Sequence, residues 1–435
     1  MSLPPLSTRL RQIAAQAADK TWVFTNLAHQ IDKELLREAF HLTRKDGAAG
    51  VDEVTGFEYE ADLESNLADL HERLRTQRYR ATPARRVRIP KEDGSERPIS
   101  IPCFEDKIVQ RAVVMLLTPI YEQDFYSFSY GFRPGMSAHQ GVNELWHGCM
   151  RFHGGTVVDA DIRGFFDRLV RGVLRDLVKR RVNDGGILRL IGKWLNAGVL
   201  DRGELINPET GTPQGGVISP LLANIYLHYV LDEWFVKVVQ PRLYGRAVLV
   251  RFADDFVIVC ELEKDSERVL AALHKRLAKY GLDLHPKKTR RVPFRKPAAY
   301  EKSSQASGNG TFDFLGFTYY WARSRRGKWV VRRRTAGKRL RRSIRMLTQW
   351  CKENLHMPLP EQYAALKRKL LGIYGYYGIR CNYESLEAVH YHARRAWQKW
   401  LSRRSRDSGL NWEKFSEKVE RHYRLPLPRI VHANV

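Results

Sequence analysis

The chain has 435 residues, of which 43% are apolar and ten are Trp, so it can bury a substantial core and is not globally disordered. Its 74 Lys and Arg outweigh 48 Asp and Glu, and the net charge of +26 favours a polyanionic partner, above all nucleic acid, over a merely solvated basic surface. Five scattered cysteines without a C-x-x-C pair argue against a disulfide framework or a zinc finger and fit a reducing cytosol. The apolar runs are too short to span a bilayer.

Helical periodicity dominates the beginning of the chain. The start, "MSLPPLSTRLRQIAAQAADK", lacks a continuous apolar stretch and predicts an amphipathic helix rather than a secretory signal. Segments 26–44 and 60–80 carry apolar residues at helical spacing, and "KDGAAGVDEVT" between them is expected to interrupt the helical structure.

Strands and helices alternate from Arg85 onward. The stretch "RRVRIPKEDGSERPISIP" alternates and turns, which predicts a hairpin that carries basic side chains. Helices are expected over 105–125, 172–200 and 265–281, and a long one after the turn "GTPQGG". Strands are expected at "TVVDAD", at "FDFLGFTYYWA" and, as strand, turn and strand, at "VLVRFADDFVIVC".

The composition changes after the loop "KSSQASGNG". From Trp321 to Trp350 the chain has twelve Lys and Arg and no acidic residue, and the rest of the C-terminal part is helical and rich in aromatic residues. We therefore expect a helical N-terminal part over 1–84, a mixed central part over 85–320 and a basic helical part over 321–435.

Two pairs of carboxylates stand out. Asp254 and Asp255 lie at the bend of an expected hairpin, where Asp is also an ordinary turn residue. Asp159 and Asp161 end an apolar strand, and alternation places both on one face of it. Two such strands, paired in one sheet, can hold two Mg²⁺ ions, which prefer oxygen ligands and stabilise both the attacking and the leaving oxygen of a phosphoryl displacement.

Two further features point to a phosphate ligand. Lys91 and Arg97 flank the turn of the basic hairpin, where they could grip a triphosphate; the alternative is a solvated basic loop. The "GTPQGG" turn (Gly211 to Gly216) lacks the Lys and Ser or Thr of a P-loop, but its glycines suit the close approach of a ligand or a base pair.

In this order, "RPISIPCFEDKIVQRAV", "YGFRPGMSAHQ", "DADIRGFFD", "GTPQGGVISPLLANIYLHYVLD", "RFADDFVIVC", "LHPKKTR" and "FDFLGF" resemble the successive motifs of bacterial group II intron reverse transcriptases. The resemblance extends over nearly the whole chain and implies RNA-templated DNA synthesis from dNTPs. We therefore expect an α+β right-hand polymerase, with fingers, a palm of antiparallel β-sheet and helices, and an α-helical thumb or maturase domain.

The resemblance also implies a metal site. Asp161 and Asp254 would bind two Mg²⁺ ions, with Mn²⁺ as an alternative, and the backbone carbonyl of Ile162 would be a further ligand. Asp255 would complete the acidic site, and Asp159 would be a neighbour rather than a ligand. Lys288 would protonate the pyrophosphate leaving group.

The same resemblance implies a set of residues around the nucleotide. Lys91 and Arg97 would grip the triphosphate, Phe166 would exclude the 2′-hydroxyl, and Gln214 would lie beside nucleotide and template, with Ile162 and Phe252 also at this site. The family usually has Tyr-Ala-Asp-Asp where this chain has Phe252. The change removes a hydroxyl but keeps the ring and the carboxylates, so activity is expected to survive.

The basic run after Arg323 is too dense for an ordinary solvated face and favours contact with phosphates, which makes binding dependent on salt without reading sequence. The residues expected to make these contacts are Arg332, Arg333, Arg334, Lys338, Arg341 and Arg342. The partners implied are an RNA template, a DNA or RNA primer, dNTPs, structured intron RNA and target DNA, with no membrane. We expect a bacterial cytoplasmic protein associated with the nucleoid.

Two other functions stay open on the sequence alone. The protein could act mainly as an RNA-binding maturase without a significant polymerase role, or as a domesticated reverse transcriptase in DNA repair or phage defence. No array of Cys and His ligands follows the basic helical part, so a short form without an endonuclease domain is expected.

Overall fold

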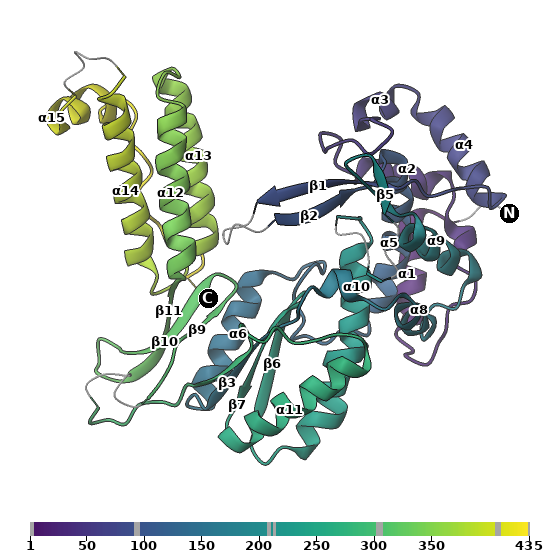
Figure 1. Ribbon diagram of the computed structural model, residues 1–435, viewed down its shortest axis with the longest axis horizontal. Coiled ribbons are helices and arrows are strands. Elements are labelled where there is room, and N and C mark those ends of the chain that lie inside the picture. The colour runs from purple at the N-terminus through teal and green to yellow at the C-terminus, as the bar shows by residue number, and fades with distance from the viewer. Residues whose placement is uncertain are drawn as a thin grey trace.

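The computed structural model describes residues 4–90, 96–206, 210–211, 215–301, 308–404 and 410–433. Helices and β-sheets are mixed along the chain, which confirms the expected α+β class (Figure 1). None of the helices within these ranges is both long enough and apolar enough to cross a membrane.

The helices before residue 247 are α1 (Leu6–Ala17), α2 (Lys33–His41), α3 (Gly56–Ala61), α4 (Leu63–Arg75), α5 (Phe104–Tyr121), α6 (Ala138–Arg151), α7 (Phe165–Arg168), α8 (Arg171–Lys179), α9 (Gly185–Asn196) and α10 (Ser219–Leu227). All of them except α6 share one apolar core with α5, whereas α6 contributes to a second core. α5 is buried around most of its circumference, as expected for a helix with apolar residues on all sides. Polar caps define several starts: Asp32 accepts from the Leu35 N–H at the start of α2, and Ser137 and Gln140 form a capping box at the start of α6.

The central sheet has the strand order β6-β7-β3-β8, with every neighbouring pair antiparallel. Its strands are β3 (Thr156–Asp161), β6 (Ala247–Phe252), β7 (Asp255–Cys260) and β8 (Arg290–Pro293). Both faces are covered: Val158 and Ile258 enter the core shared with the N-terminal helices, whereas Val157 and Val257 enter a second core on the opposite face. α11 (Glu263–Lys279) packs against the first face and α6 against the second.

A second sheet, of order β2-β1-β4-β5, carries the expected basic hairpin. It consists of β1 (Ala84–Pro90), β2 (Glu96–Ile101), β4 (Val199–Asp201) and β5 (Glu204–Ile206). β1 and β2 pair antiparallel over their whole length, so the predicted hairpin is confirmed. Figure 1 shows this hairpin extending from the N-terminal helices toward the side of the molecule where the C-terminal helices stand.

The helix after the "GTPQGG" turn is longer and less regular than a single α-helix. α10 continues into two π-helical segments, His228–Asp232 and Phe235–Val239, and a short 3-10 turn at Gln240–Arg242. The π turns change which residues face the sheet, and Asp232 becomes completely buried beneath it.

The C-terminal part is a hairpin sheet followed by a helical bundle. The sheet contains β9 (Phe312–Phe314), β10 (Phe317–Arg323) and β11 (Trp329–Thr335), and the bundle contains α12 (Gly337–Glu353), α13 (Leu359–Tyr377) and α14 (Tyr383–Leu401), followed by α15 (Trp412–Phe415). The bundle has its own apolar core. The boundary expected after residue 320 falls inside β10, which pairs with β11 from Phe317 to Arg323, so the chain leaves the sheet only at Ala336.

The last described residues fasten the bundle to the rest of the molecule. The N–H groups of Val431 and His432 donate to the Gly378 carbonyl at the end of α13 (2.8 and 2.9 Å). The His432 ring stacks on His139 of α6, with 3.8 Å between ring centroids. Nε2 of His139 in turn donates to the Tyr376 carbonyl at 2.8 Å, so α6, α13 and the C-terminal segment meet at one point.

Candidate active site

Three carboxylates meet at one end of the central sheet. β3 ends at Asp161 and β7 begins at Asp255, and the antiparallel register sets these two residues directly opposite each other. Asp254 lies in the turn that joins β6 to β7. Because opposed residues of an antiparallel pair share a face of the sheet, Asp161 and Asp255 are side by side. The prediction that paired strands bring the carboxylates together is confirmed.

Asp159 lies two residues earlier on the same face of β3, as alternation predicts, but it has a different partner. Its carboxylate accepts from Nε of Arg290 on β8 at 3.2 Å. A fixed ion pair on the neighbouring strand thus occupies Asp159, which agrees with the role of a neighbour rather than a ligand.

Lys288 reaches the acidic group from the segment before β8. Its Nζ lies 2.9 Å from Oδ2 of Asp161, while the side chain remains largely exposed. The ammonium group is therefore already at the site, although it contacts a carboxylate in this structure.

Burial, and then repulsion between the carboxylates, raise the pKa of two members of the acidic group. Burial raises the pKa of Asp254, and the negative charge of Asp161 adds to this effect. The pKa of Asp255 rises to about 6, first because the surrounding protein excludes water from its carboxyl and then because Asp254 and Asp161 repel its charge. A bound cation would relieve this repulsion.

The donor set fits a hard divalent cation. Carboxylate oxygens are the ligands that Mg²⁺ prefers, and it keeps several waters and binds substrate phosphates as well. Within the described ranges, no three His, Cys, Asp or Glu side chains already surround a point where a metal could sit. A metal at this edge would therefore need ligands besides the protein carboxylates, such as water or a phosphate.

Of the residues expected at the triphosphate, Arg97 is described and Lys91 lies outside the described residues, as does Gln214. Arg97 is exposed on β2. Its positive charge lowers the pKa of Asp254, so the basic hairpin brings a cation within electrostatic reach of the acidic turn. Gly215, next to Gln214, packs so closely on β2 that a Cβ would lie 2.4 Å from the Ser100 carbonyl oxygen.

Ile162 and Phe166 follow β3 directly. The Ile162 side chain is buried. The residues on either side of it bond to the segment 283–285: the Asp161 carbonyl accepts from the His285 N–H, and the Arg163 N–H donates to the Asp283 carbonyl. Phe166, on α7, is half-buried. Gly211 packs against its backbone, because a Cβ there would lie 2.7 Å from the Phe166 carbonyl oxygen.

The basic residues expected to contact phosphates divide into two groups. Arg334, Lys338, Arg341 and Arg342 are exposed, and Arg332 is half-exposed. Arg333 is only 5% exposed, with its guanidinium over the Trp146 ring at 5.4 Å. Because β11 is a strand, alternation turns Arg333 into the core between two outward-facing arginines, so the expectation that it contacts phosphate is corrected.

Sequence reasoning gave no role to two residues beside the acidic turn. Phe132 is 61% exposed and has a φ of 57°, and its ring centroid lies 6.3 Å from that of Phe252. Arg251, in contrast, is completely buried on β6, two residues before the turn. The available signal was a charged residue inside the apolar run "VLVRF" and a bulky residue in the "YGFRPG" turn.

Comparison with known proteins agrees with this geometry. The family model described as "Reverse transcriptase (RNA-dependent DNA polymerase)" matches residues 89–319, a segment that holds the acidic turn and the basic hairpin strand β2.

Individual relatives point the same way. Protein YkfC of Escherichia coli (strain K12) is 35% identical over 280 residues, which cover 55% of this chain and 73% of that protein. The group II intron-encoded protein LtrA of Lactococcus lactis subsp. cremoris is 39% identical over 177 residues, 40% of this chain and 29% of LtrA. Nuclear intron maturase 1, mitochondrial, of Arabidopsis thaliana is 30% identical over 93 residues, 21% of this chain and 12% of that protein. The chain therefore belongs to the reverse transcriptase family, and part of it is similar to a group II intron-encoded protein and to an intron maturase.

Proposed function

We propose that this protein is an RNA-directed DNA polymerase of a group II intron-like element. The observation that carries the proposal is the meeting of Asp161, Asp254 and Asp255 at one end of the sheet, with the pKa of Asp254 and of Asp255 raised by burial and mutual repulsion. Three crowded carboxylates in a protein of net charge +26 are costly without a cationic ligand, and they suit chemistry on nucleic acid.

In this proposal the right-hand parts are as follows. The palm is the sheet β6-β7-β3-β8 with its covering helices, the fingers are the N-terminal helices and the basic hairpin, and the thumb or maturase domain is the bundle α12–α14. We set the start of the thumb at Ala336, because β10 and β11 form one hairpin across the expected boundary.

Two Mg²⁺ ions, or Mn²⁺, would be held by Asp161, Asp254 and the Ile162 carbonyl, with Asp255 beside them. When bound, such ions stabilise the charge that develops on the attacking and leaving oxygens of an in-line displacement. The remaining side chains would position the substrate. Arg97 and Lys91 would hold the triphosphate, and Phe166, Gln214 and Phe252 would lie beside the incoming dNTP.

The proposed reaction joins the primer 3′-oxygen to the α-phosphorus of a dNTP and breaks the bond to pyrophosphate. Lys288 supplies a proton to the leaving pyrophosphate. Its ammonium group now pairs with Asp161, so it exchanges that partner for the departing phosphate during the step. A general acid held within reach by an ion pair of 2.9 Å needs only a side-chain rotation to act.

The exposed cations of β11 and α12 support a second part of the proposal. Arg332, Arg334, Lys338, Arg341 and Arg342 would contact the backbones of the RNA template, of a DNA or RNA primer and of target DNA, and also structured intron RNA, and thereby assist splicing. The relative named as an intron maturase favours this added role.

The test is primer extension on an RNA template with dNTPs and Mg²⁺. Asp161→Asn and Asp254→Asn should each lose at least about a hundredfold in rate, because a neutral amide binds Mg²⁺ poorly. Asp159→Asn is the matched control: it lies on the same strand and face but pairs with Arg290, so it should extend at close to the wild-type rate.

Two results would contradict the proposal. If wild type binds structured RNA tightly but extends no primer, the carboxylates are turn residues in an RNA-binding maturase. If Asp159→Asn fails as completely as Asp161→Asn while both remain folded, activity does not distinguish the two carboxylates, and the assignment of the metal to Asp161 rather than Asp159 is wrong.

A further inference from the structure

The turn that carries Asp254 has a demanding conformation. Ala253, the residue before Asp254, has a φ of 57°, in the left-handed region that side-chain-bearing residues rarely adopt. The Ala253 backbone also lies close against Gly131. A Cβ atom added to Gly131 would be only 2.3 Å from the Ala253 nitrogen, so there is no room for a side chain there. A conformation of this kind persists only where the surroundings hold it.

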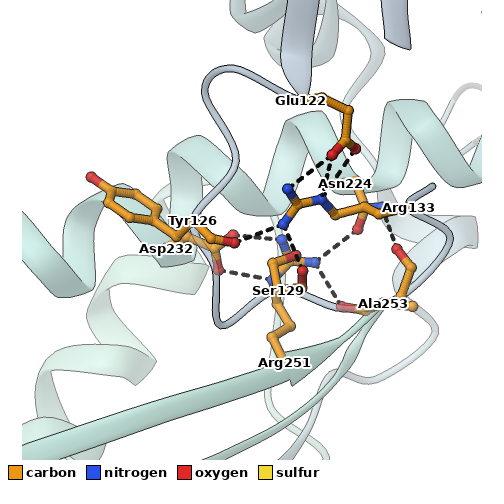
Figure 2. A network of polar contacts seen from close by, with 9 residues as sticks. Glu122, Tyr126, Ser129, Arg133, Asn224, Asp232, Arg251 and Ala253 are labelled. Atoms are coloured by element: carbon orange, nitrogen blue, oxygen red, sulfur yellow. Dashed lines mark hydrogen bonds and ion pairs between the residues drawn. The ribbon is translucent and has the colours of Figure 1, made fainter. Parts of the chain in front are cut away.

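Arg251 provides a support directly beneath the turn. Its side chain is 0% exposed, and its Nη1 donates to the Ala253 carbonyl at 3.0 Å (Figure 2). Nε and Nη2 of the same guanidinium bind the two oxygens of Asp232 at 2.8 and 2.5 Å, and Asp232 is also 0% exposed. The bidentate pair fixes the plane of the guanidinium, and this plane directs Nη1 at the turn.

Asn224 extends the support to a neighbouring loop. Its Oδ1 accepts from Arg251 Nη1 at 2.9 Å, and its Nδ2 donates to the Gly131 carbonyl at 2.7 Å. The Arg251 backbone bonds the same loop on both sides, donating to Phe128 and accepting from Tyr130, each at 2.9 Å. Arg251 is thus bonded to the turn through its side chain and to the loop that presses on the turn through its backbone and Asn224.

A second arginine closes the loop itself. Arg133 donates to the carbonyls of Tyr126 and Ser129, each at 2.7 Å, and pairs with Glu122 at 2.9 Å (Figure 2). The loop that carries Gly131 is thus bonded both by the Arg133 side chain and by the Arg251 backbone.

We propose that Arg251, together with Asp232 and Asn224, is a positioning residue that holds the Ala253 turn so that Asp254 faces Asp161. The inference rests on the proposed polymerase function. These residues touch no substrate and act through the Ala253 carbonyl and the Gly131 backbone. A buried ion pair adds little stability compared with apolar side chains of similar volume, so a role in geometry accounts for it better than a role in stability.

The first test displaces the turn without removing any partner. Gly131→Ala adds one methyl group against the Ala253 nitrogen and removes no side chain of the arginine network. We expect kcat for primer extension to fall by about tenfold or more, since an ångström-scale shift of a catalytic group has effects of this size. The Mg²⁺ concentration for half-maximal rate should rise several-fold, whereas KM for the primer–template should stay within about twofold.

Gly148→Ala is the matched control. Gly148 lies on α6 and faces Val248 of the same strand, but a Cβ there would make only an ordinary contact at 3.5 Å. It should leave kcat and the Mg²⁺ dependence unchanged.

The second variant, Arg251→Lys, keeps the charge beside Asp232. A lysine has one nitrogen and cannot bind Asp232, Asn224 and Ala253 in the plane of a guanidinium. It should show the same fall in kcat and the same rise in the Mg²⁺ requirement, measured on protein whose circular dichroism matches wild type.

Three outcomes are decisive. Normal kcat and Mg²⁺ dependence in folded Gly131→Ala and Arg251→Lys would overturn the proposal, and so would loss of folding in both, because the network would then serve stability alone. If wild type itself extends no primer, the proposed function fails, and this inference fails with it for that separate reason.

Discussion

At the scale of single residues, the burial of His228 makes the stability of the fold depend on pH. It is 5% exposed, packs against the ring of Phe125 and has no hydrogen-bond partner for Nδ1 among the described atoms. Burial, and then the charge of Arg251, lower its pKa from 6.5 to about 3. The unfolded chain therefore takes up the proton more readily, so the contribution of His228 to stability is complete above pH 6.5 and is lost as the pH falls toward 3.

The lowered pKa of His228 predicts that the free energy of unfolding decreases as the pH falls, and that replacing His228 removes this part of the decrease. Between pH 8 and pH 5, protonation of His228 in the unfolded state should cost about 2 kcal/mol of unfolding free energy. His228→Phe keeps a ring but cannot titrate, so its stability should fall by that much less over the same range. Urea unfolding at the two pH values measures the difference, and equal losses in both proteins would contradict the assignment.

The acidic residues could be predicted from sequence, whereas their support could not. Strand alternation and a turn mark the carboxylates locally, whereas the choice of Asp161 over Asp159 came from the resemblance to group II intron reverse transcriptases. The pairing of Arg251 with Asp232 joins residues 19 apart in the chain through a π-helical segment. Because nearly every residue from Ser219 to Asp232 is buried, this helix has no polar face whose phase could reveal an inserted residue, so the face that Asp232 takes was not predictable.

At the scale of elements, the strand β11 directs three consecutive arginines to different faces of its sheet. The run of Arg332, Arg333 and Arg334 looks uniform in sequence, but in a strand the middle residue faces the opposite side. The guanidinium of Arg333 lies over the Trp146 ring in the core, and that of Arg334 lies over the Tyr320 ring, 5.1 Å from its centroid. A prediction made from charge density alone could not separate them.

A matched pair of substitutions tests this sorting. Arg334→Met should weaken RNA binding about threefold, because one phosphate is then left without its cation, and should leave the melting temperature unchanged. Arg333→Met should leave RNA affinity unchanged and should not lower stability, because Met retains the apolar stem and removes a buried charge. Filter binding and thermal melting of both variants give the comparison. Equal losses of RNA affinity would show that Arg333 reaches the ligand.

At the scale of the whole molecule, the net charge of +26 predicts that association with nucleic acid depends strongly on salt. The double variant Lys338→Ala and Arg341→Ala removes two exposed cations from α12. The slope of log K against log salt for a double-stranded ligand should become shallower by about 1.8, because each phosphate that the protein neutralises contributes roughly 0.9 to it. Titrations at four salt concentrations measure the slope. An unchanged slope would mean that this face of α12 does not contact the duplex.

Changes of periodicity and charge along the chain predict three parts, and this division stays a prediction. The change of composition near residue 320 does not coincide with the end of a sheet, since β10 and β11 continue the same hairpin through the beginning of the basic run. Composition marks where the charge begins, whereas hydrogen bonding decides where a sheet ends.

The contact of His432 with His139 has a consequence for synthesis. A ribosome makes the chain from its N-terminus, so the sheet with Asp161, Asp254 and Asp255 is complete before residues 425–433 emerge. Until then the bonds from Val431 and His432 to the Gly378 carbonyl and the stacking of His432 on His139 are missing, whereas the hydrogen bond from His139 to the Tyr376 carbonyl can already join α6 to α13. The nascent protein thus passes through a stage in which the acidic edge is formed while the bundle is only partly fastened, and a ribosome stalled before Leu425 would hold it there.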